Sequence, residues 1–128
     1  MIYLDSNILI YAVEDRSERG DRVRAALVGV DAPVAVSPLV LHECLVHPLR
    51  EQDFELRDQY LAAYERLEHL DLGVDAFVRA AELRAEFGVR TPDALHLAVA
   101  QLSRCQEMWT NDRRLATASR GLAVDVLA

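Results

Sequence analysis

Four acidic residues lie at positions where a carboxylate could take part in chemistry. Asp5 and Asp112 each follow a short apolar run of the kind that forms a buried strand. Glu43 lies within an apolar stretch that is typical of a helix, and Asp93 directly follows a Thr-Pro pair, which often begins a helix. Each acid alone has an ordinary structural explanation, such as a turn, a helix cap or a side chain that faces solvent.

The four acids gain a chemical meaning if they meet. The carboxyl ends of parallel strands share one edge of an α/β sheet, where ligands bind in such folds. Two carboxylates about 5 Å apart repel each other by about 3 kcal/mol at an effective dielectric constant of about 20. A converging set therefore needs a cation, and Mg²⁺ or Mn²⁺ prefers such oxygen ligands. The expected chemistry is hydrolysis of a phosphodiester bond by a metal-activated water.

Short apolar runs alternate with longer amphipathic stretches along the chain. The runs predict five strands, at Ile2–Leu4, Val34–Val36, Leu70–Leu72, Met108–Thr110 and Val124–Leu127. The longer stretches predict helices over residues 6–13, 21–30, 39–47, 54–70, 75–87, 91–102 and 113–119. Strands that alternate with helices are typical of a parallel sheet covered on both faces. We therefore expect a single α/β domain over residues 1–128.

Two of these helices carry specific packing predictions. The stretch 39–47 is apolar nearly all round, which predicts a buried helix, and Pro48 with the polar residues 50–53 is expected to mark its end. The stretch 75–87 is amphipathic, and its expected core side chains are Phe77, Val78, Ala81 and Leu83. Both predictions decide which side chains remain free for a partner.

The composition limits the kind of function. Acidic residues number 21 against 14 basic ones, all of them arginine, and the net charge is −7. Such a chain is not a general binder of polyanions, so contact with nucleic acid would need a local arginine patch, a metal ion or both. No apolar run is long enough for a membrane helix, and no signal peptide is expected. Cys44 and Cys105 are expected to be buried thiols in a reduced, cytoplasmic protein.

Four short motifs, in order along the whole chain, resemble those of PIN-domain ribonucleases and in particular the VapC-type toxins of toxin–antitoxin pairs. They are DSN at Asp5, the helix around Glu43, TPDALHLA around Asp93 and TND ending at Asp112. The resemblance implies a three-layer sandwich with a parallel five-stranded sheet between helices. It also implies that the four acids bind metal and catalyse, with supporting polar residues at Ser6, Asn7 and Thr110.

The activity implied by the resemblance is endonucleolytic cleavage of RNA that depends on Mg²⁺ or Mn²⁺. The implied protein partner is a small antitoxin whose C-terminal segment covers the site, and promoter DNA would be bound only through that antitoxin. A homodimer is also expected. The aromatic residues Phe54, Tyr60, Tyr64 and Phe77 are candidates for self-association or antitoxin docking.

Some points stay open at this stage. Many PIN domains carry a further acid at the position of Arg114, so either one or two metals remain compatible with the sequence. Arg113 and Arg114 either contact the phosphate backbone of RNA or form a solvated helix end. His96, one turn after Asp93, either supports the site from behind the acids or is a core or edge histidine, and the second interpretation is preferred. The alternative function is a non-catalytic PIN domain that binds RNA or a partner and acts mainly through an antitoxin complex on promoter DNA.

Overall fold

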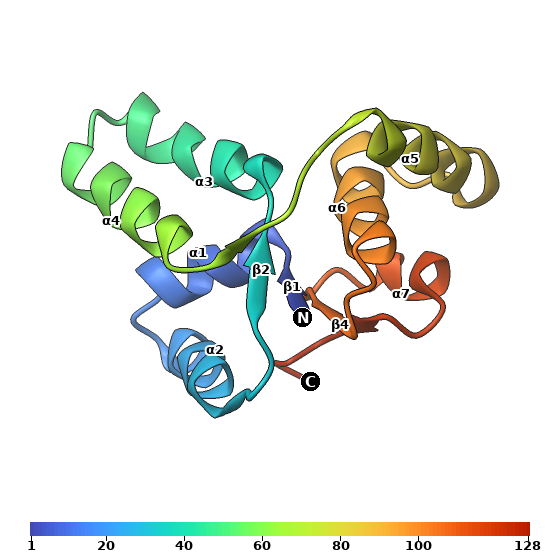
Figure 1. Ribbon diagram of the computed structural model, residues 1–128. Coiled ribbons are helices and arrows are strands. Elements are labelled where there is room, and N and C mark those ends of the chain that lie inside the picture. Colours follow the sequence, from blue (N-terminus) through green and yellow to red (C-terminus); the bar gives the residue numbers. More distant parts are fainter.

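The computed structural model describes all residues from 1 to 128 and contains one parallel sheet with helices on both faces (Figure 1). Its five strands lie in the order β3-β2-β1-β4-β5, and every neighbouring pair is parallel. The expected α/β architecture with a five-stranded parallel sheet is confirmed. The strands are β1 (Ile2–Leu4), β2 (Val34–Val36), β3 (Glu68–His69), β4 (Glu107–Trp109) and β5 (Ala123–Val124).

Seven helices connect the strands, with α1 to α4 gathered on one side of the sheet and α5 to α7 on the other (Figure 1). The chain changes sides after β3, so the strand order reverses between β1 and β4 at the centre of the sheet. Ligands of open α/β sheets bind beyond the carboxyl ends of the strands at such a reversal. The helices are α1 (Ser6–Glu14), α2 (Glu18–Gly29), α3 (Pro38–Arg50), α4 (Phe54–Glu65), α5 (Val74–Phe87), α6 (Thr91–Leu102) and α7 (Arg114–Ser119).

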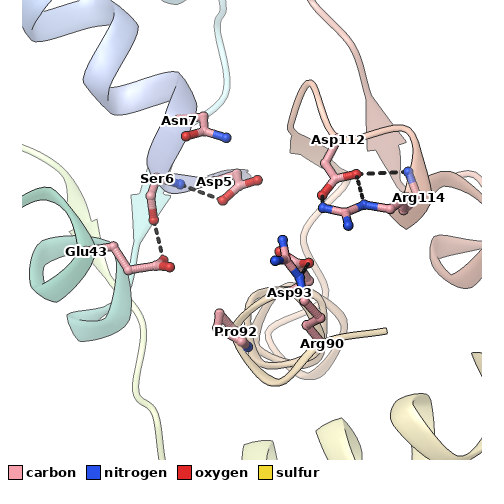
Figure 2. A pocket seen from close by; sticks show the side chains of 9 residues that line it. All are labelled: Asp5, Ser6, Asn7, Glu43, Arg90, Pro92, Asp93, Asp112 and Arg114. Carbon is pink, nitrogen blue, oxygen red and sulfur yellow. Dashed lines mark hydrogen bonds and ion pairs between the residues drawn. The ribbon is translucent and has the colours of Figure 1, made fainter. Parts of the chain in front are cut away.

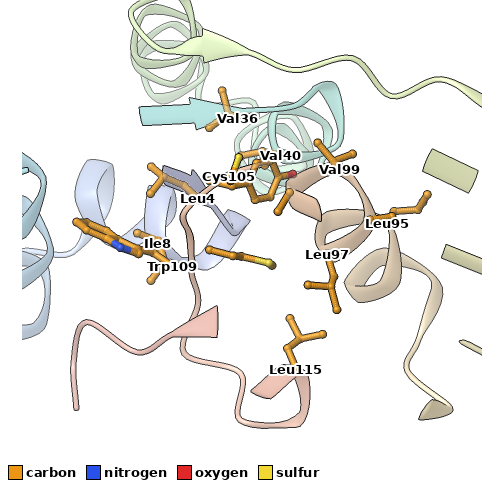
Figure 3. Close-up of a cluster of buried hydrophobic side chains, with 14 of the residues drawn as sticks. Leu4, Ile8, Val36, Val40, Leu95, Leu97, Val99, Cys105, Trp109 and Leu115 are labelled. Atoms are coloured by element: carbon orange, nitrogen blue, oxygen red, sulfur yellow. The ribbon is translucent and has the colours of Figure 1, made fainter. Parts of the chain in front are cut away.

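The core lies around β1 and helix α6 (Figure 3). All three residues of β1 are buried, and every residue of α6 from 94 to 100 is buried as well. A strand enclosed on both faces is apolar throughout, and a helix in such a core is apolar nearly all round. Both elements that carry candidate acids at their ends are therefore held rigidly by packing. Cys44 and Cys105 are buried free thiols, as expected.

The edge strand β3 lies two residues earlier than predicted. The sequence suggested Leu70–Leu72, whereas Glu68–His69 pairs with β2, because helix α4 already ends at Glu65. Both residues of β3 are exposed, and the strand is held by hydrogen bonds to β2 rather than by burial. A hydrophobic pattern cannot mark a strand of this kind.

The prediction of a buried helix is wrong for α3, although the helix does end among the residues expected to stop it. Helix α3 continues to Arg50 with Pro48 buried inside it, and the ring removes only one backbone donor close to the helix end. Val46 and Leu49 are 42% and 48% exposed, so one side of α3 faces away from the core. An apolar side chain on this helix is therefore no proof of burial.

The predicted core face of α5 is also largely wrong. Leu83 is buried, but Phe77, Val78 and Ala81 are exposed. The other buried residues of the helix are Ala76 and Ala80. These alanines lie four residues apart on the stripe that packs against α6, where small side chains allow a close approach of the two helices. No helix in the structure has both the length and the apolar character needed to cross a membrane.

Candidate functional site

The four candidate acids line one pocket at the carboxyl edge of the sheet (Figure 2). Asp5 follows β1, Asp112 follows β4, and Glu43 and Asp93 come from helices α3 and α6 on opposite sides of the sheet. The pocket has a volume of about 360 Å³ and no hydrophobic lining residue. Its other lining residues are Ser6, Asn7, Arg90, Pro92 and Arg114.

Asp5 is buried and held in place by two hydrogen bonds. Its Oδ1 accepts from the backbone N–H of Ser6 at 2.7 Å, and its Oδ2 accepts from the hydroxyl of Thr110 at 2.7 Å. The same Thr110 oxygen accepts the backbone N–H of Asp112 at 3.1 Å. Thr110, a predicted supporting residue, thus connects the two acids that follow neighbouring strands.

Glu43 projects from α3 and is held by Ser6 and His96. The Ser6 hydroxyl donates to Glu43 Oε1 at 2.5 Å, and His96 Nε2 contacts the same oxygen. Burial alone would raise the pKa of Glu43, but hydrogen bonds from His96 and Ser6 outweigh it and hold that pKa below its ordinary value. Glu43 is therefore charged at neutral pH, with one oxygen fixed by its neighbours.

His96 combines the two interpretations that the sequence left open, because it lies in the core and also supports the site. Its side chain is buried, yet Nε2 reaches Glu43 and Nδ1 lies 2.6 Å from the hydroxyl of Tyr3, which in turn lies 2.8 Å from the Ser37 hydroxyl. Burial raises the pKa of Tyr3 well above its ordinary value, so this hydroxyl keeps its proton. In a neutral imidazole, Tyr3 can donate to Nδ1 while Nε2–H donates to Glu43.

The sequence reading missed Tyr3 and Ser37 as parts of this polar chain. One signal was present, because alternate residues of a strand share a face, and Tyr3 therefore projects to the same side as Asp5. Ser37 is the N-cap residue of α3, but it makes no side-chain cap bond, and its hydroxyl contacts Tyr3 instead.

Asp93 lies in the first turn of α6 in an unfavourable electrostatic environment. Burial, followed by repulsion from Asp112 and Asp5, raises the pKa of Asp93 above its ordinary value. Arg90 offers partial compensation, with its Nε 3.7 Å from Asp93 Oδ2. The repulsion shows that three carboxylates of this pocket are close enough to interact.

Asp112, in contrast, is strongly paired. Arg114 donates from Nε to Oδ1 at 3.1 Å and from Nη2 to Oδ2 at 2.9 Å, and its backbone N–H donates to Oδ1 at 3.0 Å. These hydrogen bonds hold the pKa of Asp112 below its ordinary value. Arg113, predicted together with Arg114 as an RNA contact, is exposed and does not line this pocket.

The remaining predicted supporting residue, Asn7, lies at the rim of the pocket and is exposed. Its Nδ2 lies 3.5 Å from the Oδ1 of Asn111, which is a weak hydrogen bond. Asn111 in turn donates to the hydroxyl of Tyr11 at 2.8 Å. Asn7 is therefore free to turn toward a ligand at little cost.

The carboxylate oxygens of the four acids are the kind of ligand atom that a hard divalent cation prefers. The mutual repulsion around Asp93 is also what a bound cation would relieve. The four carboxylates lie farther apart than one ion requires. No group of three acidic, histidine or cysteine side chains is arranged to hold a metal ion in this structure. The acids of the pocket are therefore suitable metal ligands in their chemistry, but in this structure the Asp112 carboxylate is paired with Arg114.

Comparison with known proteins decides the family. The family model of the PIN domain matches residues 2–121. The chain belongs to the PIN-domain family. The match includes all four acids, and PIN-domain nucleases generally use divalent metal ions.

Solved structures share this PIN fold over nearly the whole chain. A toxin–antitoxin complex from Klebsiella pneumoniae is 24% identical, with 98% of each chain covered and a TM-score of 0.82. VapBC2 from Rickettsia felis, bound to a DNA fragment from its promoter, is 22% identical, with 97% of this chain and 98% of that chain covered and a TM-score of 0.78. VapC20 from Mycobacterium tuberculosis, a toxin that cleaves the sarcin-ricin loop, is 17% identical, with 92% and 95% covered and a TM-score of 0.78. No curated protein matches the sequence.

Divalent cations are expected to stabilise this PIN domain through the acidic pocket. At an ion concentration ten times the Kd, Mg²⁺ or Mn²⁺ should raise the melting temperature by about 5 °C, because selective binding to the folded state contributes about 1.4 kcal/mol. Asp5→Asn should lose most of this shift, since Asp5 is the acid fixed at the centre of the edge. Differential scanning fluorimetry with and without the ion measures both values. Equal shifts in the two proteins would remove Asp5 from the site.

Proposed function

We propose that the protein is a metal-dependent endoribonuclease and the toxin of a type II toxin–antitoxin pair. One observation carries the proposal: four carboxylates from four separate elements line a single hydrophilic pocket in a chain of the PIN family. Structural relatives that include an RNA-cleaving toxin and two toxin–antitoxin complexes support it.

The proposed roles follow from the state of each side chain. Asp5, Asp93 and Asp112, with Glu43, would hold Mg²⁺ or Mn²⁺, which supplies an activated water and stabilises the leaving oxygen. Glu43 Oε1 is occupied by Ser6 and His96, whereas Oε2 has no hydrogen-bond partner within the chain and can orient the attacking water. Thr110 fixes the position of Asp5 relative to the backbone of Asp112 through its two hydrogen bonds.

The function is tested with protein purified under denaturing conditions and then refolded, so that no partner remains. It is incubated with total bacterial RNA in Mn²⁺, in Mg²⁺ and in EDTA, beside the Asp93→Asn variant. We expect discrete fragments that require the metal and are absent with the variant. A folded protein that binds no metal and cleaves no RNA would contradict the proposal.

An antitoxin partner is proposed on the same grounds. Two of the relatives are toxin–antitoxin complexes, and one of them is bound to promoter DNA. With a net charge of −7, this chain would leave the contacts with DNA to its partner. Co-expression with the protein encoded by the neighbouring gene should suppress the RNA cleavage described above.

A homodimer is proposed through the exposed apolar side chains of α5. Val74, Phe77 and Val78 are 79%, 52% and 57% exposed, and clusters of exposed apolar side chains are typical of interaction surfaces. Tyr60 is excluded as a contact, because it is fully buried. We expect Phe77→Glu to shift the protein from dimer to monomer in light scattering after size exclusion. Val28→Glu, at an 88% exposed position of α2, should leave the mass unchanged, and a wild-type monomer would contradict the proposal.

One observation favours a second candidate, a non-catalytic PIN domain that acts through its antitoxin complex on promoter DNA. Arginines pair with Asp93 and Asp112, and no three acids are close enough to share an ion. The same incubation separates the two functions, because this candidate predicts an intact RNA pool in Mn²⁺.

A further inference from the structure

Two arginines stand among the acids of the pocket, and the proposed metal chemistry does not use them. Arg114 pairs with both oxygens of Asp112, and Arg90 lies beside Asp93 (Figure 2). Both guanidinium groups are largely in solvent, with side chains 65% and 70% exposed. They provide the only positive charge that lines the pocket.

These ion pairs are easily exchanged. Exposed ion pairs contribute little to stability, because water screens the charges and the long side chains lose conformational freedom. Neither arginine packs into the core, so a guanidinium can leave its carboxylate without disturbing the fold. A divalent cation that binds Asp112 and Asp93 would remove most of their attraction for the arginines.

A second hollow adjoins the acidic pocket at the same two arginines. It has a volume of about 200 Å³ and shares Arg90, Asp93 and Arg114 with the main pocket, while Phe87 and Val89 contribute apolar surface. The guanidinium groups therefore stand between a set of carboxylates and a partly apolar hollow. The acids, the arginines and the apolar side chains thus follow one another along the surface. A nucleotide could bind there with its phosphate near the arginines and its base near the apolar side chains.

We propose that Arg114, assisted by Arg90, is an exchangeable counter-ion that pairs with the acids in the metal-free protein and binds a phosphate of the RNA when a divalent cation has bound. This inference rests on the proposed nuclease function and adds a phosphate subsite next to the acidic pocket. The planar guanidinium suits both partners, since it forms paired hydrogen bonds with carboxylate and with phosphate oxygens.

The exchange has two consequences of opposite sign. In the free protein Arg114 competes with the cation for Asp112, so its removal should strengthen metal binding. In the complex with RNA it holds a phosphate, so its removal should weaken the use of RNA. A residue that only stabilised the fold would change both properties in the same direction.

The test compares the wild-type protein with Arg114→Gln in two measurements. Isothermal titration with Mn²⁺ in the absence of RNA should show about two- to fivefold tighter binding by the variant. Cleavage of RNA in saturating Mn²⁺ should show kcat/KM lower by about tenfold. The slope of log KM against log salt concentration should fall by about 0.7, the value for one lost phosphate contact on a single strand.

Arg57→Gln is the control, because Arg57 also pairs with a nearby aspartate, Asp58 on α4, but does not line the pocket. It should change none of the three quantities. Unchanged or weaker Mn²⁺ binding by Arg114→Gln would overturn the exchange, and an unchanged kcat/KM would overturn the phosphate subsite. A folded wild-type protein that binds Mn²⁺ but cleaves no RNA would instead contradict the proposed function on which the subsite rests.

Discussion

Asp93→Asn is expected to abolish RNA cleavage and yet to raise the melting temperature of the metal-free protein. The loss of activity should be about a thousandfold or more, since a metal-binding carboxylate stabilises the transition state by several kcal/mol. The gain in stability follows from the environment of the carboxylate, because burial and repulsion by Asp112 and Asp5 raise its pKa. Thermal unfolding in EDTA should show a rise of about 1–3 °C.

The control for this variant is Asp75→Asn. Asp75 also lies in the first turn of its helix, α5, but it does not line the acidic pocket. Asparagine there loses the favourable interaction of an anion with the helix N-terminus, so the melting temperature should fall slightly. A fall for Asp93→Asn as well would mean that Asp93 is mainly a helix-capping group.

The stability gain of Asp93→Asn over the wild-type protein is expected to increase with pH. The folded-state pKa of Asp93 is raised above its ordinary value of 3.8. Between the pKa of Asp93 in the unfolded chain and its higher pKa in the folded protein, the folded protein binds more protons. The wild-type protein therefore loses stability as the pH rises through the folded-state pKa of Asp93. The advantage of Asp93→Asn over wild type should be full at neutral pH and should disappear below about pH 3.

His96→Leu is expected to lower both stability and activity. Leucine is of similar size but removes one of two hydrogen-bond partners from each of two groups. The buried Tyr3 hydroxyl keeps only Ser37, and Glu43 Oε1 keeps only Ser6. A buried hydrogen bond contributes about 1 kcal/mol, and one to a charged group contributes about 1.5–3 kcal/mol, so urea unfolding should show a loss of about 2–3 kcal/mol. Cleavage should fall by about ten- to a hundredfold, because Glu43 loses one of the two groups that orient it.

Two variants separate the positioning role of His96 from a general loss of stability. His96→Gln can offer one donor and one acceptor, so it should recover much of the activity even if it is less stable than wild type. His47→Leu changes an exposed histidine on α3 and should affect neither property. Equal activity of the Gln and Leu variants would show that His96 does not act through hydrogen bonds.

The local sequence predicted the features that depend on nearest neighbours in the chain. Asp5 and Asp112 follow apolar runs, and strands β1 and β2 lie at the predicted residues because those runs are buried on both faces. Alternation of strands and helices was enough to predict a parallel sheet. Because Asp5 and Asp112 each follow a strand, both were expected at the carboxyl edge of that sheet. The four acids therefore reach one pocket as the sequence suggested.

Tertiary structure alone decided which side chains meet. His96 contacts Glu43, 53 residues away along the chain, and Tyr3 contacts Ser37, 34 residues away. Phe77 is exposed because Ala76 and Ala80 form the contact stripe of α5, a choice that depends on the neighbouring helix α6. Periodicity describes one element at a time, whereas burial and pairing depend on what lies opposite. The sequence thus determined where the acids lie, and the packing of α3 and α6 across the sheet determined which partners control their charge.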